Sequence, residues 1–383
     1  MSFLHVIFWA ALAFCGYTLA GYWVLLMVAG RLLRRRRLRL PIEPTVSILI
    51  AVRDAEHLIE QKVRNCLALN YEREKLEVIV ACDGPSPATA EIVNSFQNPC
   101  VRCASFPRQG KSAALSAALP GSAGSIVVFT DVSVRLDAEG LRTIVSNFAD
   151  SRVGCVTSED VTSNDSGNAE PMYVSFDRYM RRLESNVRTL VGASGSFFAV
   201  RRELCRDLDP ELANDFLLAL RTIEAGYDVV VDPAARGFIA AGDANREFDR
   251  KVRTVVNGID TLLRHFRLLN PFRYGWAAWE LASHKLFRWL LPFAFLITFV
   301  SNCLIFNSGK VYVWTLLGQS AVYGIGGVSL AVTCLQRFLP LRLAAFFVMG
   351  CGATLRAWWD LCRGERHVAW EPTHRSAVSD QQL

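Results

Sequence analysis

The sequence predicts an α/β protein with a mostly parallel sheet and with apolar helices at both ends of the chain. Strand-like and helix-like patterns alternate through residues 41–270, which favours βαβ units. The apolar run at residues 126–130 is typical of a strand buried on both faces, and it ends on Asp131. The chain is 51% hydrophobic with a mean hydropathy of +0.23, and the excess lies at the two ends. These ends predict membrane-spanning helices.

The first forty residues have the pattern of a membrane anchor. Residues 3–30 contain no charged side chain apart from a potential charge on His5, and they exceed the roughly 20 residues that cross a bilayer. Six arginines follow at once: Arg31, Arg34, Arg35, Arg36, Arg37 and Arg39. Cations beside an apolar span mark its cytoplasmic side, so we expect the amino end outside and the bulk of the chain inside. A cleaved signal peptide is disfavoured because the basic start is missing and the apolar stretch is too long.

The charge balance and the cysteines exclude other classes of protein. The formal net charge is +6, which the arginine run alone supplies, so the rest of the chain is about neutral. A nucleic-acid binder would carry a basic surface distributed over its fold, so no nucleic-acid partner is expected. The eleven cysteines show no disulfide framework, and Cys100 and Cys103 form a lone CxxC that is a weak zinc signal.

Short apolar runs separated by turn-forming residues predict the secondary structure of residues 41–270. Runs rich in β-branched residues predict strands at residues 46–52, 77–82, 126–130, 153–157, 197–200 and 228–231. Polar–apolar periodicity and alanine-rich stretches predict helices at residues 54–69, 88–96, 111–119, 137–148, 172–190, 214–225 and 246–268. Asp54 is the expected cap of the first helix, and the Asp83-Gly84-Pro85 turn ends the second strand.

The C-terminal third is apolar again. Residues 286–306, 311–335 and 343–361 are long enough to span a bilayer, and residues 271–285 form an interfacial segment with Trp276 and Trp279. The number of spans stays open between two and three, because Arg342 and Arg356 interrupt the last one. Four crossings in all would put the polar tail at residues 363–383 outside, whereas its arginines favour the inside.

Three acids, Asp83, Asp131 and Asp215, stand where strands or loops end. Each one alone is explained equally well as a turn former or a helix cap. Asp131 is a candidate for metal or phosphate chemistry, because ligands of open α/β sheets gather at the carboxyl ends of the strands. A second acid two residues later would make an Asp-x-Asp metal motif, and Ser133 stands there instead.

Six segments in chain order carry a resemblance to a known family. They are VSILIAVRD at residues 46–54, VACDG at 80–84, GKSAAL at 110–115, FTD at 129–131, SGSFFAVRR at 194–202 and NDF at 214–216. The set resembles the family-2 inverting glycosyltransferases with the GT-A fold, above all the membrane-embedded synthases of cellulose, hyaluronan and poly-N-acetylglucosamine type. The resemblance covers about residues 46–270, and residues 368–375 are similar to the cytoplasmic tails of these enzymes. It implies a mixed, mostly parallel sheet flanked by helices.

The resemblance implies a donor site for a nucleotide-diphosphate sugar, most simply one that carries uridine. The nucleotide would lie against Ala51, Arg53 and Asp54 at the end of the first strand, and Asp83 would read the base or ribose. Lys111 would face the diphosphate. Asp131 would hold a divalent metal, Mg²⁺ or Mn²⁺, which neutralises the leaving diphosphate in the family. Because Ser133 replaces the second acid, the metal requirement is left open.

The same resemblance assigns the acceptor side. Asp215 would be the base that takes the proton from the acceptor hydroxyl, although it could also simply cap a helix. Gly195 and Ser196 would form a small-residue wall for the acceptor, or a tight turn. Arg250 and Arg253 stand where processive members carry Gln-x-x-Arg-Trp, and they would contact diphosphate or form a solvated helix face. Thr254 replaces the tryptophan, so single addition and processive synthesis both stay open.

Two functions from different classes follow. The first is inverting sugar transfer to a polysaccharide or lipid-linked acceptor at the cytoplasmic face of the inner (plasma) membrane. Membrane lipid and synthase or export proteins would be its partners. The second is a degenerate, non-catalytic scaffold that binds nucleotide or a partner synthase, for which Ser133 is the best support. The expected organisation is an anchor at 1–40, a catalytic domain at 41–270, an interfacial segment at 271–285, spans at 286–362 and a tail at 363–383.

Overall fold

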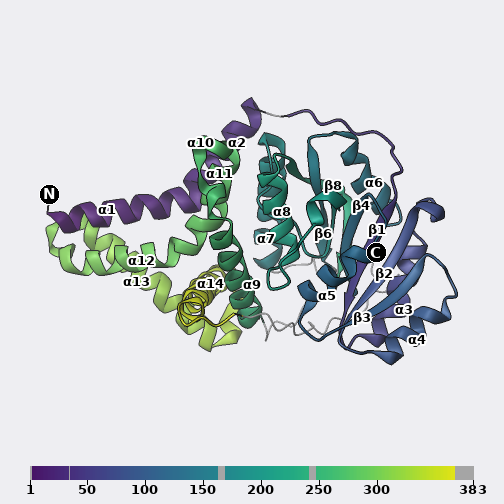
Figure 1. Cartoon of the computed structure of the whole chain (residues 1–383). Coiled ribbons are helices and arrows are strands. Elements are labelled where there is room, and N and C mark those ends of the chain that lie inside the picture. The colour runs from purple at the N-terminus through teal and green to yellow at the C-terminus, as the bar shows by residue number, and fades with distance from the viewer. Residues whose placement is uncertain (1, 34, 163–168, 241–246, 367–383) are drawn as a thin grey trace.

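A computed structural model describes residues 2–33, 35–162, 169–240 and 247–366, and it shows an α/β domain from which a bundle of helices projects (Figure 1). The strands are β1 Val46–Val52, β2 Leu76–Asp83, β3 Val101–Phe106, β4 Ile126–Asp131, β5 Val134–Leu136, β6 Val153–Thr162, β7 Phe197–Arg201 and β8 Asp228–Ile239. The helices of the domain are α3 Glu56–Leu67, α4 Pro87–Ser95, α5 Lys111–Ala118, α6 Gly140–Ser146, α7 Ala169–Val187, α8 Asn214–Glu224 and α9 Glu247–Arg264. The helices before and after it are α1 Phe3–Gly16, α2 Tyr22–Leu32, α10 Pro271–Tyr274, α11 Trp276–Leu281, α12 Phe287–Ile305, α13 Lys310–Ala331 and α14 Leu339–Cys362.

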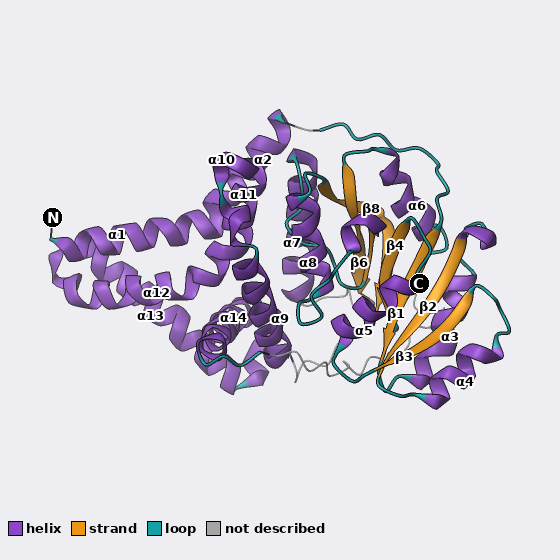
Figure 2. Cartoon of the chain, viewed as in Figure 1, coloured by secondary structure: helices purple, strands orange, loops and turns teal. Residues whose placement is uncertain are grey.

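The described strands form one sheet of mixed direction, in the order β3-β2-β1-β4-β7-β6-β8-β5 (Figure 2). The pairs β3–β2, β2–β1, β1–β4 and β6–β8 are parallel, whereas β7 runs antiparallel to both β4 and β6, and β5 runs antiparallel to β8. The expected mixed, mostly parallel sheet is therefore confirmed. In the parallel half, β1, β2 and β4 deliver their carboxyl ends to one edge of the sheet.

The sheet separates two hydrophobic cores because successive residues of a strand point to opposite faces. In β4, Val128 packs with α3, α4 and α6, whereas Val127 and Phe129 pack with α5 and α8 on the other face. The second core also contains Leu262 of α9 and Leu281 of α11. The α/β domain and helix α11, which leads to the projecting bundle, therefore share one core.

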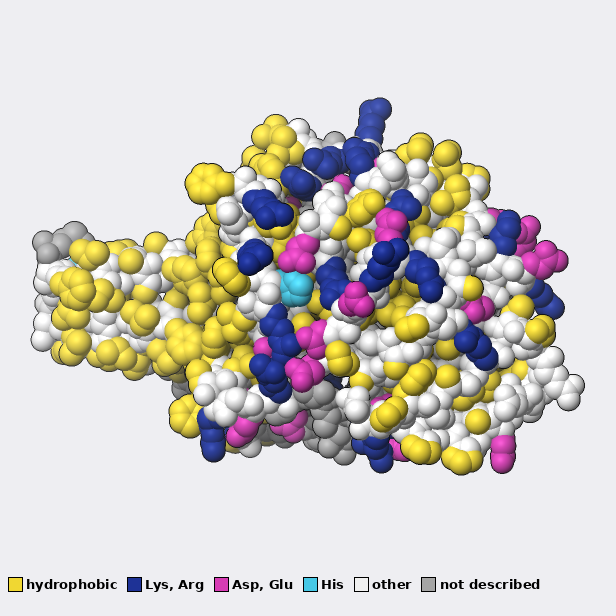
Figure 3. Space-filling view, viewed as in Figure 1, with side chains coloured by type: hydrophobic (Ala, Val, Ile, Leu, Met, Phe, Trp, Pro, Cys, Tyr) yellow, Lys and Arg dark blue, Asp and Glu magenta, His cyan; other side chains and the backbone are white. Residues whose placement is uncertain are grey.

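The projecting bundle is apolar on its outside. Figure 3 shows hydrophobic side chains over most of it, while charged side chains gather over the α/β domain. Among the described residues, three helical segments are long and apolar enough to cross a membrane: Phe3–Leu32, Trp276–Ser308 and Leu339–Cys362. The helix α13, which was expected to span as well, is not among them. The expected interfacial segment is not a separate unit, because α11 continues through the π-turn η8 (Ala282–Leu286) into α12.

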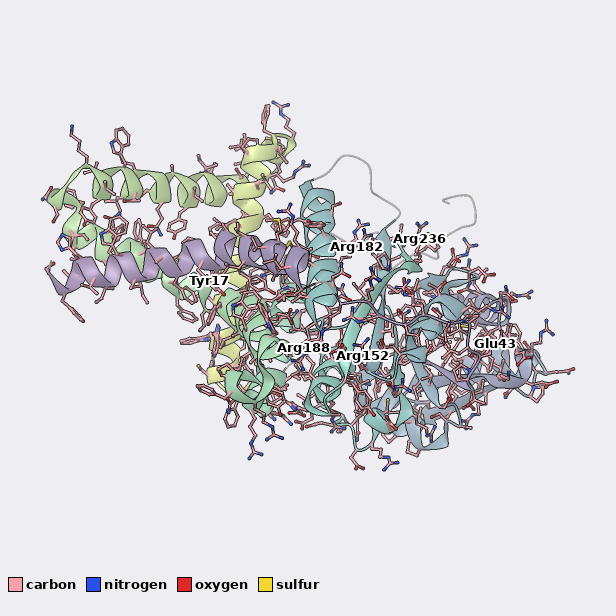
Figure 4. All side chains as sticks on the ribbon, turned by 90° about the horizontal axis from the view of Figure 1, so that it is seen from above. Tyr17, Glu43, Arg152, Arg182, Arg188 and Arg236 are labelled. Atoms are coloured by element: carbon pink, nitrogen blue, oxygen red, sulfur yellow. The ribbon has the colours of Figure 1, made fainter. Side chains whose placement is uncertain are left out.

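The N-terminal segment is tied to the rest of the chain at two places. Figure 4 shows Tyr17 on the purple N-terminal segment, where its hydroxyl accepts a hydrogen bond from Trp279 Nε1 at 2.9 Å. Further on, the arginine run pairs with acids of the α/β domain. Arg35 lies 3.4 Å from Asp228 and Arg39 lies 3.0 Å from Asp232. The sequence predicts that the arginine run marks the cytoplasmic side of the anchor. The structure shows that two of its arginines also form ion pairs with acids of β8. Arg34 lies outside the described residues.

The predicted elements are found, with corrections at their ends. Ala55 and not Asp54 is the cap of α3, because Asp54 adopts a left-handed conformation with φ of 50° and its carboxylate makes no capping bond. The strands β6 and β8 run well beyond the expected ends, to Thr162 and Ile239. The short strands β3 and β5 were not expected. The tail resemblance at residues 368–375 lies outside the described residues.

Candidate functional site

The candidate site lies where β1, β2 and β4 end. Ala51 on β1 is in register with Ala81 on β2 and with Asp131 on β4, so the three chains end side by side. Ala51 is buried, and its small side chain leaves the edge open to the residues that follow. Arg53, Asp54, Asp83 and Asp131 are therefore brought together by strand register, as the sequence predicted.

Asp83 ties the glycine–lysine turn to this edge. Its Oδ1 accepts hydrogen bonds from the backbone amides of Gln109 (2.8 Å) and Gly110 (2.9 Å). Gly110 has a φ of 107°, a conformation that favours glycine, and it starts α5 at Lys111. The second oxygen of Asp83, Oδ2, is buried and has no hydrogen-bond partner among the described residues; its nearest cation is Arg53 at 3.8 Å. A buried acceptor without a donor is costly, so this oxygen is suited to a ligand donor.

Asp54 and its neighbours form the exposed rim of the site. The Asp54 carboxylate accepts a hydrogen bond from Arg108 at 2.8 Å and lies 3.6 Å from Arg53 Nε. Asp54 and Arg108 are both more than half exposed. An exposed pair of this kind contributes little to stability, so the rim can rearrange around a ligand at low cost.

Lys111 and Asp131 form an ion pair at the centre of the site, with about a third of each side chain exposed. The lysine sits in the first turn of α5 and the acid at the last position of β4. The described residues contain no group of three His, Cys, Asp or Glu side chains that could hold a metal ion. One carboxylate fits a Mg²⁺ or Mn²⁺ ion whose remaining ligands are substrate phosphates and water, which is a common arrangement for Mg²⁺.

Ser133 belongs to the other side of the strand. It lines a cavity of about 310 Å³ between α3 and the β4–β5 turn, together with Lys62 and Arg135. Lys62 is only 2% exposed and donates hydrogen bonds to Thr130 Oγ1 (2.9 Å) and to the Val134 carbonyl. Burial lowers the pKa of Lys62, and the neighbouring Asp131 and Cys66 partly oppose this effect. Lys62 therefore fixes the turn that carries Asp131.

The loop before β7 links Asp131 to Asp215. The Asp131 amide donates to the Ser196 carbonyl at 3.2 Å. One residue earlier, a Cβ added to Gly195 would lie 2.9 Å from Asp215 Oδ2, so the base candidate packs directly on this glycine. Asp215 is not a helix cap: Ala213 is the cap of α8, and Asp215 Oδ1 accepts a hydrogen bond from the amide of its own neighbour, Phe216, at 2.8 Å. Its other oxygen faces the loop.

Asp160 holds this loop, and the sequence reasoning missed it. Its Oδ2 accepts a hydrogen bond from Ser194 Oγ at 2.5 Å, and its Oδ1 accepts one from Ser196 Oγ. The Ser194 amide also donates to Thr157 Oγ1 at 2.8 Å. The preceding residue, Glu159, faces the other way and pairs with Arg182 at 2.6 Å. The signal was available, since these acids follow an apolar strand as Asp131 does, but the strand was expected to end at residue 157.

Arg250 and Arg253 are not brought to Asp131 by the described contacts. Arg250 makes a two-pronged ion pair with Glu247 on its own helix, at 2.9 and 2.7 Å. Lys251 beside it lies over the Phe346 ring of α14, so this part of α9 faces one of the candidate membrane spans. Thr254 Oγ1 donates to the Arg250 carbonyl at 2.9 Å within the helix. The predicted contact of these arginines with diphosphate remains a prediction.

Comparison with known proteins shows what this domain is similar to. The family described as "Glycosyl transferase family 2" matches residues 47–209, which include Ala51, Asp83, Lys111, Asp131 and the Ser194–Ser196 loop. These residues of the chain are similar to glycosyl transferase family 2. The solved structure of "Mannosyltransferase PcManGT from Pyrobaculum calidifontis in complex with GDP-Man and Mn2+" is similar with a TM-score of 0.73 and 19% identity, covering 94% of this chain and 100% of that chain. At this identity the likeness shows the fold, and the predicted GT-A fold is confirmed.

The curated relatives that the chain matches are distant in sequence, at 23–28% identity. The probable glycosyltransferase YdaM of Bacillus subtilis is 25% identical over 50% of this chain. A beta-monoglucosyldiacylglycerol synthase of Trichormus variabilis is 28% identical over 42% of it. A poly-beta-1,6-N-acetyl-D-glucosamine synthase of Staphylococcus aureus is 23% identical over 64% of it. The matches span 50%, 36% and 64% of the lengths of these three relatives.

Proposed function

We propose that the chain transfers a sugar, with inversion, from a nucleotide-diphosphate sugar to a polysaccharide or lipid-linked acceptor at the cytoplasmic face of a membrane. A UDP-sugar is the proposed donor. The observation that carries this proposal is the Gly195–Ser196 segment, which contacts Asp215 on one side and the Asp131 amide on the other. The proposed donor phosphate station, Asp131, and the proposed base, Asp215, thus both lie against one loop.

The donor nucleoside is proposed to lie over the ends of β1 and β2. Asp83 Oδ2, which lacks a donor, would accept a hydrogen bond from the base or ribose. Arg53 and Arg108 would contact the nucleotide from the rim, as their pairs with the exposed Asp54 rearrange. Lys111 would turn from Asp131 to the diphosphate, since about a third of its side chain is exposed at the start of α5.

In the transfer itself, the acceptor hydroxyl attacks the anomeric carbon from the face opposite the leaving group. The bond from that carbon to the diphosphate oxygen breaks, a bond to the acceptor oxygen forms, and the hydroxyl proton passes to Asp215. Lys111 stabilises the charge that develops on the nucleoside diphosphate. A divalent metal held by Asp131 and the phosphates would add positive charge at the same place.

The proposal places the family-2 domain on the cytoplasmic side of an inner (plasma) membrane. The arginine run that follows Phe3–Leu32 supports this side. Membrane lipid and a synthase or export protein are proposed partners. The non-catalytic scaffold is retained as the second candidate, because Asp131 has no second acid beside it and already pairs with Lys111.

The decisive experiment compares wild type with Asp215→Asn in membranes that contain the full-length chain. Radiolabelled nucleotide sugars are supplied, and the products are partitioned into lipid, polymer and water. Loss of the base should lower transfer by about 100-fold or more while UDP binding with Mn²⁺ is kept. Glu224→Gln, at the other end of α8, is the matched control and should transfer normally.

Three outcomes would contradict the proposal. Unchanged transfer in Asp215→Asn would exclude this carboxylate as the base. UDP binding without transfer from any sugar of the panel would favour the scaffold. If neither UDP nor GDP bound with any metal, both candidates would fail, and Asp131→Ala provides the comparison for the metal-dependent part of binding.

A further inference from the structure

The cavity between α3 and the β4–β5 turn lies apart from the residues assigned to the donor and the acceptor. Its volume is about 310 Å³, at the lower end of the range of small-molecule sites. Apolar walls with a few polar groups are typical of such sites, and this cavity has both. The lining includes Leu58, Lys62, Asn65, Val132, Ser133 and Val134. The proposed function gives this cavity no role.

Two lysines approach the end of β4 from opposite faces of the sheet, because α3 and α5 pack in the two separate cores. Lys111 at the start of α5 pairs with Asp131. Lys62 of α3 donates to Thr130 Oγ1 at 2.9 Å and to the Val134 carbonyl. The cavity beside Lys62 therefore lies on the face away from the proposed diphosphate contact.

Lys62 is a buried ammonium whose hydrogen-bond acceptors are neutral. It is 2% exposed, and neither the Thr130 hydroxyl nor the Val134 carbonyl carries a charge. An ammonium has three N–H donors, so one of them is left without an acceptor among the described residues. Asp131 attracts Lys62 from a distance, but its carboxylate already pairs with Lys111. Burying a cation without an anionic partner is costly, so an anion in the cavity would stabilise this place.

The other polar groups of the lining differ in what they already bind. Asn65 donates to the Leu136 carbonyl at 2.9 Å and accepts from the Leu136 amide at 2.8 Å, so it is engaged with β5. Arg135 also lines the cavity, and it has a partner of its own. Ser133 is partly exposed, and its hydroxyl makes no hydrogen bond within the described part of the chain. Lys62 and Ser133 are therefore the groups that a ligand would bind.

The two bonds of Lys62 link the cavity to the donor station. They join Thr130, the residue before Asp131, to Val134, the residue after Ser133. Lys62 thus closes the turn that carries Asp131. An anion at Lys62 and a nucleoside diphosphate at Lys111 would lie on the two sides of this turn, where like charges repel. Binding at either place should weaken binding at the other by the same factor.

We propose that this cavity binds a small organic anion with a carboxylate or phosphate head and an apolar body. The head accepts hydrogen bonds from Lys62 and Ser133, and the body packs against Leu58 and Val132. The bound anion weakens binding of the donor nucleotide through the shared turn, which makes the cavity a regulatory site. The inference goes beyond the proposed function, because binding at Lys62 does not require sugar transfer.

The test measures binding to the detergent-solubilised full-length chain by titration calorimetry. The probes are phenyl phosphate, benzoate, phenol and inorganic phosphate, and the first two distinguish the two heads. The preferred anion should bind about tenfold or more tightly than neutral phenol, because a charge-assisted hydrogen bond carries the affinity. It should also bind more tightly than inorganic phosphate, which has no apolar body. Saturating UDP with Mn²⁺ should weaken it about fivefold, with no further loss at higher UDP concentration.

Two variants remove the site in different ways. Lys62→Met removes the ammonium and should weaken the anion by about tenfold or more. Ala68→Trp fills the cavity and keeps Lys62, so it should block the anion while UDP still binds, and it carries the test if Lys62→Met does not fold. Lys111→Gln should weaken UDP and keep the anion. Lys75→Met is the matched control, since Lys75 pairs with Glu72 on the surface, and it should bind the anion as wild type does.

Several results would overturn the inference. Phenol that binds as tightly as both anions would exclude an anion site, and inorganic phosphate that binds as tightly as phenyl phosphate and benzoate would mean an adventitious ion only. Complete displacement by UDP, or loss of binding in Lys111→Gln, would place the anion at the donor station. Wild-type affinity in both Lys62→Met and Ala68→Trp would exclude the cavity. Affinity that UDP leaves unchanged would overturn the regulatory link.

Failure of the proposed function gives a different result. If the chain neither binds UDP nor transfers sugar, the proposed function fails, and the anion site is still decided by the comparison with phenol and by Lys62→Met and Ala68→Trp. If UDP binds and sugar is transferred while no anion binds at Lys62, only this inference fails.

Discussion

Asp160 provides the sharpest test of the loop that carries the site. Asp160→Asn keeps the shape of the side chain and removes the charge that accepts from Ser194 and Ser196. A hydrogen bond to a charged group contributes about 1.5–3 kcal/mol and a neutral one about 0.5–1.5 kcal/mol, so each of the two bonds loses about 1 kcal/mol. The sum of about 2 kcal/mol corresponds to a factor of about 30 in rate.

The loss should appear in transfer and not in donor binding. Ser194 and Ser196 flank Gly195, which contacts Asp215, so a looser loop misplaces the base and the acceptor wall. We expect kcat/KM to fall by up to about 30-fold in Asp160→Asn, and further in Asp160→Ala, because small misplacements of reacting groups are costly. UDP affinity should change little, since Asp83 and Lys111 are untouched.

Glu159→Gln is the matched control for this experiment. Glu159 is the preceding residue of β6 and pairs with Arg182 and Arg178 on α7 instead of the loop. Its loss should lower thermal stability modestly and leave kcat/KM within a few-fold of wild type. If Asp160→Asn transfers at the wild-type rate, or if Glu159→Gln is equally impaired, the positioning role of Asp160 is refuted.

Three further predictions follow from individual contacts. Lys111→Gln should weaken UDP binding by about tenfold or more, because a charge-assisted contact to the diphosphate is lost; unchanged affinity by titration calorimetry would exclude that role. Gly195→Ala should lower transfer at least tenfold while UDP still binds, because its Cβ would lie 2.9 Å from Asp215 Oδ2 and turn the carboxylate away; normal transfer would show that the loop yields. Asp150→Asn should cost about 1–2 kcal/mol of stability at pH 7. The Arg152 guanidinium, together with the amides of Arg152 and Leu38, holds the pKa of Asp150 below its usual range although burial opposes this. Its contribution is therefore present above the unfolded-state pKa of about 3.9 and is lost as pH falls below it, so melting curves should show a shallower acid decline in the variant.

The parallel half of the sheet was predictable because its strands carry continuous apolar runs. All seven residues of β1 are buried, and such a pattern is hard to mistake. The strand β3 was missed because it lies at the sheet edge, where its residues are half-buried or exposed and the apolar signal fades. The antiparallel direction of β7 was not predictable either, since a strand's residues do not encode which neighbour it will join.

The candidate site was predictable where its residues stand at the ends of strands that the sequence indicates. Asp83, Lys111 and Asp131 meet there, as expected from the strand pattern and the family resemblance. The role of Asp160 was missed because β6 was expected to end at residue 157, and its contact with Ser194 forms only in the folded sheet. The two acids on β6 gave a local signal, but nothing in the sequence indicates that Asp160 faces the loop before β7 whereas Glu159 faces α7.

The shared core has a consequence for which acceptors can react. Leu217 of α8, next to the base, packs in the same core as Leu262 of α9 and Leu281 of α11. Because α11 continues without a break into α12, the depth of Asp215 relative to the membrane is set by packing and not by a flexible linker. Interiors of this kind are close-packed and resist displacement. On the proposed function, an acceptor anchored in the bilayer would therefore have to present its hydroxyl at the fixed depth of Asp215.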